Sequence, residues 1–306
     1  MPAPQTGPPQ PDEGGEHRPS GYRTLPFAVA PDKYDPVRER LEIELLLEGV
    51  YRQHGFDFRS YSYSSVRRRL WRRARAEGLE TVSALQDRVL HDPAVMERLL
   101  HDMSINVTAM FRDPAFYQAF REEVVPRLRT YPFIRIWHAG CSTGEEVVSM
   151  AILLREAGLH DRVRLYATDM SEVVLQRARA GVFPIARMQE YTENYQRAGG
   201  TRAFSEYYSA SYDGAVFDPS LLAPVVFSQH NLATDRGFSE FHVIVCRNVL
   251  IYFDRALQAR VHGLFYESLA TFGVLGLGVR ESLRCSEYED CYEPVNITQK
   301  LFRKVR

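Results

Sequence analysis

Apolar residues recur along the chain with two different periods, and the change of period divides the sequence. In residues 36–104 they return every three or four positions, as at Leu41 and Leu45, which predicts amphipathic helices. Farther along, short apolar runs alternate with helical stretches. Residues 134–139 and 241–246 have the near-continuous apolar character of buried parallel strands. The pattern predicts an all-α N-terminal domain followed by a doubly wound α/β domain.

Composition shifts along the chain set the expected boundaries. Residues 1–35 are rich in proline and poor in large apolar side chains, which predicts a disordered tail. Residues 105–130 are expected to form a linker and a lead-in helix, and residues 131–306 the α/β domain. Within that domain, residues from about 184 to 228 contain many Tyr and Phe and the turn signal Asp213-Gly214. They predict a small antiparallel β insertion.

A glycine turn joins the first predicted strand to a helix. Gly140 and Gly144 interrupt the apolar run and put free backbone N–H groups at the carboxyl end of the strand, where open parallel sheets bind ligands. Glu145 and Glu146 follow at once and would repel a pyrophosphate. Asp169 ends the next predicted strand, 25 positions beyond Gly144, where a carboxylate can bind ribose hydroxyls. These residues leave nicotinamide nucleotides and S-adenosylmethionine both open.

Two further segments carry candidate chemistry. Arg112 is the permanent cation of the polar segment 105–112 and suits a carboxylate. The strand at residues 241–246 ends in Arg247-Asn248, and Tyr252 follows shortly after. Because catalytic groups in this fold class lie at strand ends, both segments are expected to reach the site.

A basic helix is predicted in the N-terminal domain. Its arginines would form a stripe that docks an acidic partner, although a solvated face with Arg stems covering the core is an equally ordinary interpretation. The stripe consists of Arg68, Arg69, Arg72, Arg73 and Arg75.

Composition excludes several classes. The 306 residues carry a net charge of −1, so no bulk attraction to nucleic acid or anionic lipid is expected. The four cysteines lack CxxC spacing, which argues for reduced thiols in a cytoplasm rather than a disulfide framework or a zinc site. No signal peptide and no run of eighteen apolar residues are found. We expect a cytoplasmic protein that does not insert into a membrane and needs no metal.

Four sequence blocks carry a resemblance to a known family. They are INVTAMFRD, RIWHAGCSTGEEVVSMA, YATDMS and FHVIVCRNVLIYFD, in that order, within roughly residues 50 to 305. The chain resembles the CheR family of chemotaxis-receptor glutamate methyltransferases. The resemblance implies a class I methyltransferase fold (Rossmann-like) and S-adenosyl-L-methionine as cofactor, with S-adenosyl-L-homocysteine as product. It also implies that a chemoreceptor cytoplasmic domain provides the substrate and meets the basic helix. A monomer is expected.

The resemblance also assigns residues. The family's cofactor motif matches Asn106, Thr108 and Arg112, and its Asn-Leu pair beside the adenine matches Asn231 and Leu232. We further expect Glu145 to bind the cofactor's amino group, Asp169 its ribose, and Arg112 and Tyr252 to orient the substrate carboxylate. Gly140, Arg247 and Asn248 complete the predicted cofactor site.

Two departures from the family pattern keep other functions open. Val147-Val148 replace the usual Pro-Tyr, and Val279-Arg280 replace the usual His-Ser before Glu281. A regulatory adaptor that binds S-adenosylmethionine without transferring methyl groups is therefore an alternative, and a nicotinamide-dependent oxidoreductase is another.

Overall fold

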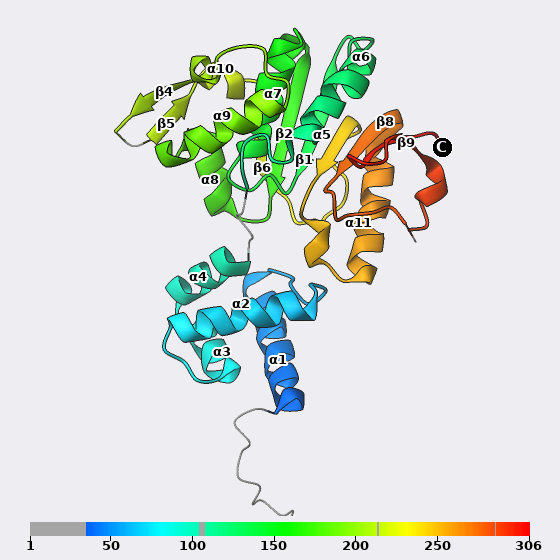
Figure 1. The fold of residues 1–306 in the computed structure, drawn as a ribbon. Helices are drawn as coiled ribbons and strands as arrows, with labels where there is room; N and C mark the ends of the chain where they lie inside the picture. Colours follow the sequence, from blue (N-terminus) through cyan, green and yellow to red (C-terminus); the bar gives the residue numbers. More distant parts are fainter. Residues whose placement is uncertain (1–34, 104–107, 213, 285) are drawn as a thin grey trace, which may run out of the picture.

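The computed structural model describes residues 35–103, 108–212, 214–284 and 286–306. Asn106 and the predicted proline-rich tail therefore lie outside the described residues, apart from Asp35 at the end of the tail. The N-terminal helices form a body beside the sheet domain (Figure 1). They are α1 (Pro36–His54), α2 (Tyr63–Ala76), α3 (Val82–His91) and α4 (Pro93–Met103). They follow the periodicity of the sequence: Asp35 caps α1 by accepting from Val37 N, and Gly55 ends it in the left-handed conformation.

The second domain is a twisted sheet with helices on both faces (Figure 1). The strand order is β6-β2-β1-β7-β8-β10-β9, in which β6 to β8 are parallel and β10 runs antiparallel to both its neighbours. The strands are β1 (Ile134–Ala139), β2 (Val163–Asp169), β6 (Val225–Gln229), β7 (Phe241–Cys246), β8 (Leu269–Leu277), β9 (Tyr292–Asn296) and β10 (Leu301–Lys304). Its helices are α5 (Pro114–Ala119), α6 (Val125–Leu128), α7 (Glu145–Glu156), α8 (Glu172–Ala180) and α11 (Arg255–Ser268), with a π-helical turn at Phe120–Val124. The predicted doubly wound fold is confirmed.

The central strands are buried on both faces. Val243 and Val245 of β7 pack in one hydrophobic cluster, whereas Ile244 and Cys246 pack in another. Side chains alternate across a strand, so a strand between two layers of helices must be apolar at nearly every position. The same requirement explains the continuous apolar runs of the sequence.

A second, antiparallel sheet is inserted in the sequence between α8 and β6. It has the order β3-β5-β4 and is accompanied by α9 and α10. The elements are β3 (Val182–Phe183), α9 (Met188–Arg197), β4 (Tyr208–Ser211), β5 (Gly214–Phe217) and α10 (Pro219–Leu222). The structure begins this insertion at residue 182 and ends it before β6, which belongs to the main sheet. Asp213, half of the predicted turn, lies outside the described residues.

One buried carboxylate attaches the insertion to α7. Glu156 accepts hydrogen bonds from Tyr207 (3.0 Å), from the backbone N–H of Thr201 (3.1 Å) and from Tyr195. It also forms an ion pair with Arg121. Because the Glu156 side chain is 2% exposed, these donors replace water completely.

The two domains touch through a short backbone bridge. Tyr61 pairs with Phe253 in an antiparallel β-bridge. On either side of it, Ser62 N donates to Tyr252 O (2.8 Å) and Asp254 N donates to Ser60 O (2.9 Å). The loop before α2 is thus fixed against the segment that carries Tyr252.

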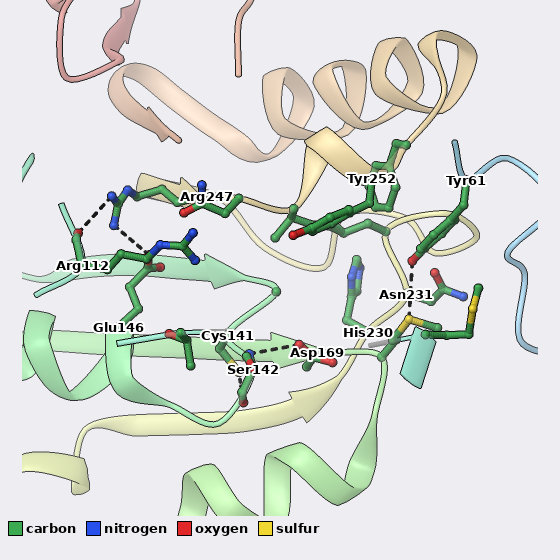
Figure 2. A pocket seen from close by; sticks show the side chains of 18 of the residues that line it. Tyr61, Arg112, Cys141, Ser142, Glu146, Asp169, His230, Asn231, Arg247 and Tyr252 are labelled. Carbon is green, nitrogen blue, oxygen red and sulfur yellow. Dashed lines mark hydrogen bonds and ion pairs between the residues drawn. The ribbon is translucent and has the colours of Figure 1, made fainter. Parts of the chain in front are cut away.

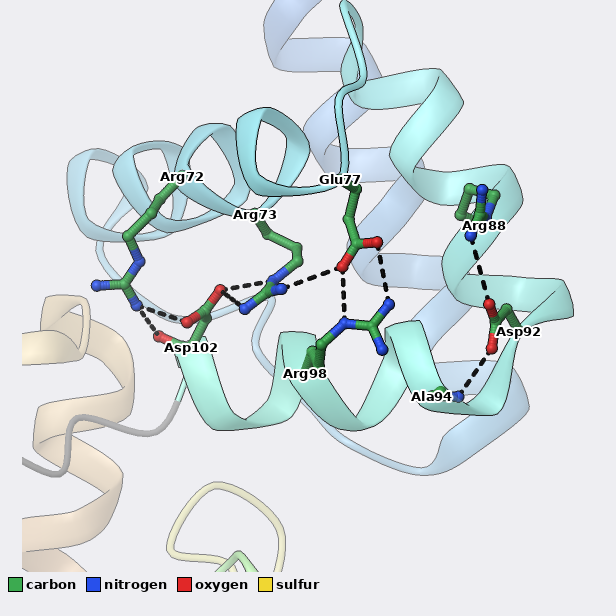
Figure 3. Close-up of polar contacts among 8 residues, drawn as sticks. All are labelled: Arg72, Arg73, Glu77, Arg88, Asp92, Ala94, Arg98 and Asp102. Carbon is green, nitrogen blue, oxygen red and sulfur yellow. Dashed lines mark hydrogen bonds and ion pairs between the residues drawn. The ribbon is translucent and has the colours of Figure 1, made fainter.

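The structure corrects the predicted basic stripe on α2. Arg69 is 4% exposed and donates to Met103 O, so it faces inward. Arg73 is paired with Asp102 (2.6 Å) and Glu77 (3.1 Å), as Figure 3 shows. Asp102 also pairs with Arg72, which stays 63% exposed. The partners of these arginines lie at the end of α2 and in α4. The helical period of α2 alone therefore could not predict these contacts.

The remaining exposed arginines of the predicted stripe lie at the surface of α2. They are Arg68, Arg72 and Arg75. In the described ranges no helix combines the length and the hydrophobicity that crossing a bilayer requires.

Candidate functional site

A pocket lies where the carboxyl ends of β1, β2 and β7 meet the N-terminal domain, and it contains about 950 Å³ of space including its open mouth. Its lining combines apolar side chains with a few converging polar groups, as small-molecule and cofactor sites do. Figure 2 shows its lining from close by. Of the residues that the sequence predicts for the site, those that line the pocket are Thr108, Arg112, Gly140, Asp169, Asn231, Leu232, Arg247, Asn248 and Tyr252.

The turn after β1 contributes Gly140, Cys141 and Ser142 to the lining of the pocket. Gly140 has φ +83°, and a Cβ atom there would come within 2.6 Å of Val249 Cγ2. Gly144 has φ +95° and packs equally closely on Ala178 of α8, at 2.9 Å from a built Cβ. Both positions need glycine, because a larger residue would be strained in φ and would also collide. The two glycines thus let the turn pack closely against Val249 and Ala178.

Asp169 ends β2 beside the turn after β1. Its carboxylate accepts from Ser142 N (3.0 Å) and Ser171 N (3.1 Å), which fix its orientation. Burial raises the pKa of Asp169 above its ordinary value, and these N–H groups oppose the rise. An oriented carboxylate with remaining acceptor capacity at this strand end can bind vicinal hydroxyls.

The two glutamates after Gly144 point in different directions. Glu145 is buried, accepts from Thr143 Oγ1 (2.7 Å), and does not line the pocket, whereas Glu146 does. Successive helix residues are rotated by about 100°, so only one of two neighbours can face the strand end. Glu146 therefore faces the pocket in this structure, and the role of Glu145 in binding the cofactor's amino group stays a prediction.

Glu146 belongs to a buried network. His138 Nδ1 lies 2.9 Å from its Oε1, and Arg247 Nη1 lies 3.4 Å from its Oε2. Burial alone would raise the pKa of Glu146, but His138 and Arg247 together hold it below its ordinary value. His138 Nε2 is buried and has no hydrogen-bond partner among the described residues, and because an ionised carboxylate only accepts, His138 Nδ1 is the donor to Glu146. Glu146 thus keeps its negative charge and can attract an ammonium group.

Arg247 ties this network to the segment that carries Arg112. Its Nη2 donates to Asp113 Oδ2 (2.6 Å) and to Arg112 O (3.1 Å), and its guanidinium lies 4.2 Å from the centre of the Phe116 ring. These contacts fix the backbone at Arg112. Arg247 lines the pocket, so its role as a cofactor contact stays a prediction. Its contacts with Arg112, Asp113 and Glu146 make it a support of the pocket wall.

Backbone conformations around the pocket are unusual. Phe111 (φ +50°), Asp113 (φ +57°), Ser142 (φ +50°) and Asn248 (φ +61°) all adopt the left-handed conformation, which is uncommon outside glycine. Such residues persist where the surroundings over-determine them, and they gather at functional sites. Here they flank Arg112 and form two of the turns that line the pocket.

Glu281 shapes the turn at Asn248. Its carboxylate accepts from the backbone N–H groups of Gly278 (2.6 Å), Asn248 (3.1 Å), Val249 (2.8 Å) and Ile251 (3.4 Å). Burial raises the pKa of Glu281, and the four N–H groups oppose this. Because Asn248, Val249 and Tyr252 line the pocket, this carboxylate sets the shape of one wall.

Comparison with known families identifies the chain. The model of the CheR methyltransferase S-adenosylmethionine-binding domain matches residues 106–301, and that of the CheR methyltransferase all-alpha domain matches residues 41–104. The chain belongs to the CheR methyltransferase family. The expected resemblance is thereby confirmed, and with it the cofactor: this CheR methyltransferase is an S-adenosylmethionine-dependent enzyme.

Individual relatives of the chain are also named methyltransferases. Cher3 of Pseudomonas putida, a candidate methyltransferase, is 52% identical over 86% of this chain and 97% of its own length. A chemotaxis protein methyltransferase of Listeria innocua is 30% identical over 76% of this chain and 87% of its own. Chemotaxis protein methyltransferase 2 of Pseudomonas aeruginosa is 30% identical over 77% and 81%.

The pocket of this CheR methyltransferase fits the cofactor chemically. Asp169 offers a carboxylate to ribose hydroxyls, and Glu146 offers one to an amino group. Both acids also suit a ligand with a positively charged sulfur. The described residues contain no group of three or more His, Cys, Asp or Glu side chains arranged to bind a metal ion.

Sequence reasoning missed part of this lining. Tyr61 and Met103 reach the pocket from the N-terminal domain, and His138 and Glu281 support it from behind. The helical and strand periods give no sign that Tyr61 or Met103 reaches the pocket. Glu146 is recognisable in the sequence as the second of two acids, and only the orientation of α7 about its axis was missing to place it in the lining.

Proposed function

We propose that this CheR methyltransferase is a protein-glutamate O-methyltransferase that modifies glutamate side chains of a chemoreceptor cytoplasmic domain. The proposal is supported by the relatives named chemotaxis protein methyltransferases. The observation that carries it is that Arg112 and Tyr252 line the same pocket as Asp169 and Glu146. A carboxylate-binding cation and a tyrosine thus face the same space as the acids suited to the cofactor.

The proposed chemistry requires alignment rather than acid–base catalysis. When bound, S-adenosylmethionine supplies an electrophilic methyl group. A glutamate side chain is ionised at neutral pH, so no general base is needed to activate it. We infer that Arg112 orients the incoming carboxylate and that the Tyr252 side chain limits its approach to one direction. Correct alignment can lower a barrier by about 7 to 11 kcal/mol.

The departures from the family pattern lie away from this chemistry. Val147 and Val148 are fully buried in the hydrophobic core behind α7, and Val279 is exposed. Neither they nor Arg280 line the pocket. These positions therefore give no reason to prefer a binding-only adaptor, and the match to an S-adenosylmethionine-binding domain leaves a nicotinamide-dependent oxidoreductase without support.

Docking of the receptor is assigned to the outer face of α2. Arg68, Arg72 and Arg75 are exposed there and suit an acidic helical surface, whereas Arg69 and Arg73 act inside the domain. Since chemoreceptor methylation takes place on the cytoplasmic side, we infer a cytoplasmic location. Monomeric state remains a prediction.

The test is methyl transfer from labelled S-adenosylmethionine to membranes that contain chemoreceptors, with release of the label by mild base as the mark of an ester. The proposal predicts base-labile labelling, loss of cofactor affinity in Asp169→Ala, and reduced turnover in Tyr252→Phe. Tyr212→Phe, at a fully exposed tyrosine, is the matched control. Cofactor binding without labelling of any receptor would favour the adaptor instead.

A further inference from the structure

Helix α1 is apolar on two faces, and only the inner one is buried. The outer face carries Val37, Leu41 and Leu45, which are 78%, 55% and 50% exposed. Their spacing of four positions puts the three side chains in one row along the helix, called here the outer stripe of α1. The inner face packs in the core of the N-terminal domain through Ile43, Leu46, Leu47 and Val50.

Polar contacts flank the outer stripe. Arg40 forms an ion pair with Glu44 at 3.0 Å, and Glu42 accepts a hydrogen bond from Ser83 of α3 at 2.7 Å. Single exposed apolar side chains are ordinary on a protein surface, whereas a row of them with a polar rim is typical of a surface that another segment covers.

The chain that leads into α1 contains a matching apolar segment. Residues 1–34 lie outside the described part of the chain and end at the N-cap of α1. Within them, Leu25, Phe27 and Val29 occupy every second position. This period of two puts all three side chains on one side of an extended chain, and Pro26 disfavours a helix there.

The two apolar rows also match in length. Side chains two positions apart in an extended chain are separated by about 6.6 Å. Side chains four positions apart in a helix are separated by about 6 Å. The seven residues between the rows include Pro31-Asp32, where the chain can turn back and run antiparallel to α1. The pairs of facing residues would be Val29 with Val37, Phe27 with Leu41, and Leu25 with Leu45.

A tethered segment suits the outer stripe better than a second copy of the chain. Stable interfaces between proteins involve about 20 to 30 residues on each side, far more than the three of the stripe. A segment joined to α1 by a short connection has an effective concentration on the order of millimolar, so that a small contact suffices.

We propose that residues 25–29 bind along the outer stripe of α1 as an extended strap. The strap belongs to the N-terminal domain, although the composition of residues 1–35 predicts a disordered tail. It also lies beside the start of α2, because the Arg40 guanidinium is 5.6 Å from the centre of the Tyr63 ring.

Disulfide trapping in the full chain tests the strap. Leu25→Cys combined with Leu45→Cys puts one thiol at the far end of each row and leaves the other two contacts intact. The matched control is Thr24→Cys with Leu45→Cys, because Thr24 lies one position away and on the other side of the extended segment. We expect the intramolecular disulfide, identified by mass spectrometry, to form about tenfold faster in the first pair. Adding Phe27→Ser should lower that rate to the rate of the control.

Equal rates for the two cysteine pairs would overturn the proposal. A dimer linked through Leu45→Cys of two chains, without the intramolecular disulfide, would overturn it as well and show that a second copy covers the stripe.

Proteolysis gives a second measurement without added cysteines. Leu41→Ser should speed cleavage by chymotrypsin after Phe27 several-fold, because the strap is then released more often. Cleavage by trypsin after Arg18, outside the strap, should keep its rate. Cleavage after Phe27 at the same rate in the variant and the wild type would contradict the strap.

Discussion

The backbone N–H of Val249 donates a 2.8 Å hydrogen bond to Glu281, a residue 32 positions farther along the chain. The same carboxylate accepts from Gly278, Asn248 and Ile251. Four backbone donors thus converge on one buried side chain, which connects the end of β8 with the turn after β7. The wall of the pocket that carries Tyr252 depends on this connection.

Replacing Glu281 with Gln should therefore damage activity without touching the ligand. The amide group would present donors to backbone N–H groups, and each buried donor left without an acceptor costs about 1 to 3 kcal/mol. We expect kcat/KM for methyl transfer to fall at least about tenfold. Glu287→Gln, at an exposed glutamate nearby, should behave as wild type. Equal activity of the two variants would contradict the positioning role.

Arg247 should be essential for the stability of the site. Its side chain is 2% exposed and pairs with Asp113 and Glu146. Arg247→Met would leave a buried carboxylate without its cation, and breaking a buried pair in this way costs about 3 kcal/mol. Urea denaturation should show this loss in the free energy of unfolding. Arg280→Met removes an exposed arginine and should show no comparable change.

Glu156 should control the order of the insertion. Glu156→Gln removes the negative charge that Arg121, Tyr195 and Tyr207 surround. We expect faster amide hydrogen exchange at Thr201 and in the following turn, with the N-terminal helices unaffected. Glu193→Gln, at an exposed position of α9, provides the comparison. A uniform change over the whole chain would show that Glu156 acts globally instead.

Glu77 should make the N-terminal domain sensitive to acid. Its hydrogen bonds from Arg98, and then those from Arg73, lower its pKa to about 2 (Figure 3). A carboxyl group with a depressed pKa in the folded state stabilises the fold above its unfolded pKa of about 4.3, and this stabilisation is lost as the pH falls. The midpoint temperature of thermal unfolding, measured from pH 6 to pH 2, should therefore decrease less steeply for Glu77→Gln than for wild type. Parallel curves would rule out this contribution.

The fold and part of the site could be predicted because they depend on local signals. Asp169 ends an apolar run, Gly140 follows one, and both reach the pocket as expected. Which of Glu145 and Glu146 lines the pocket depends on the rotation of α7 about its axis, which the sequence alone leaves open. A shift of one position along the helix changes which side chain faces the ends of the strands.

The arginines of α2 illustrate a second limit. A helical projection places Arg73 on the surface, but in the structure Arg73 is largely buried in an ion pair with Asp102 of α4. Tyr61 looks like an ordinary loop residue, and its importance follows from a contact with Phe253 some 190 positions away. Tertiary partners at such separations decide burial, and no period or short motif encodes them.

The bridge between Tyr61 and Phe253 has a practical consequence for anyone dissecting the enzyme. A fragment that starts at the lead-in helix would contain the whole Rossmann-like sheet, yet it would lack one side of its own binding chamber and would expose Phe253 and Met170 to solvent. Such a truncated catalytic domain should aggregate and turn over slowly. Its defects would therefore give no information on how tightly the missing helices bind a receptor.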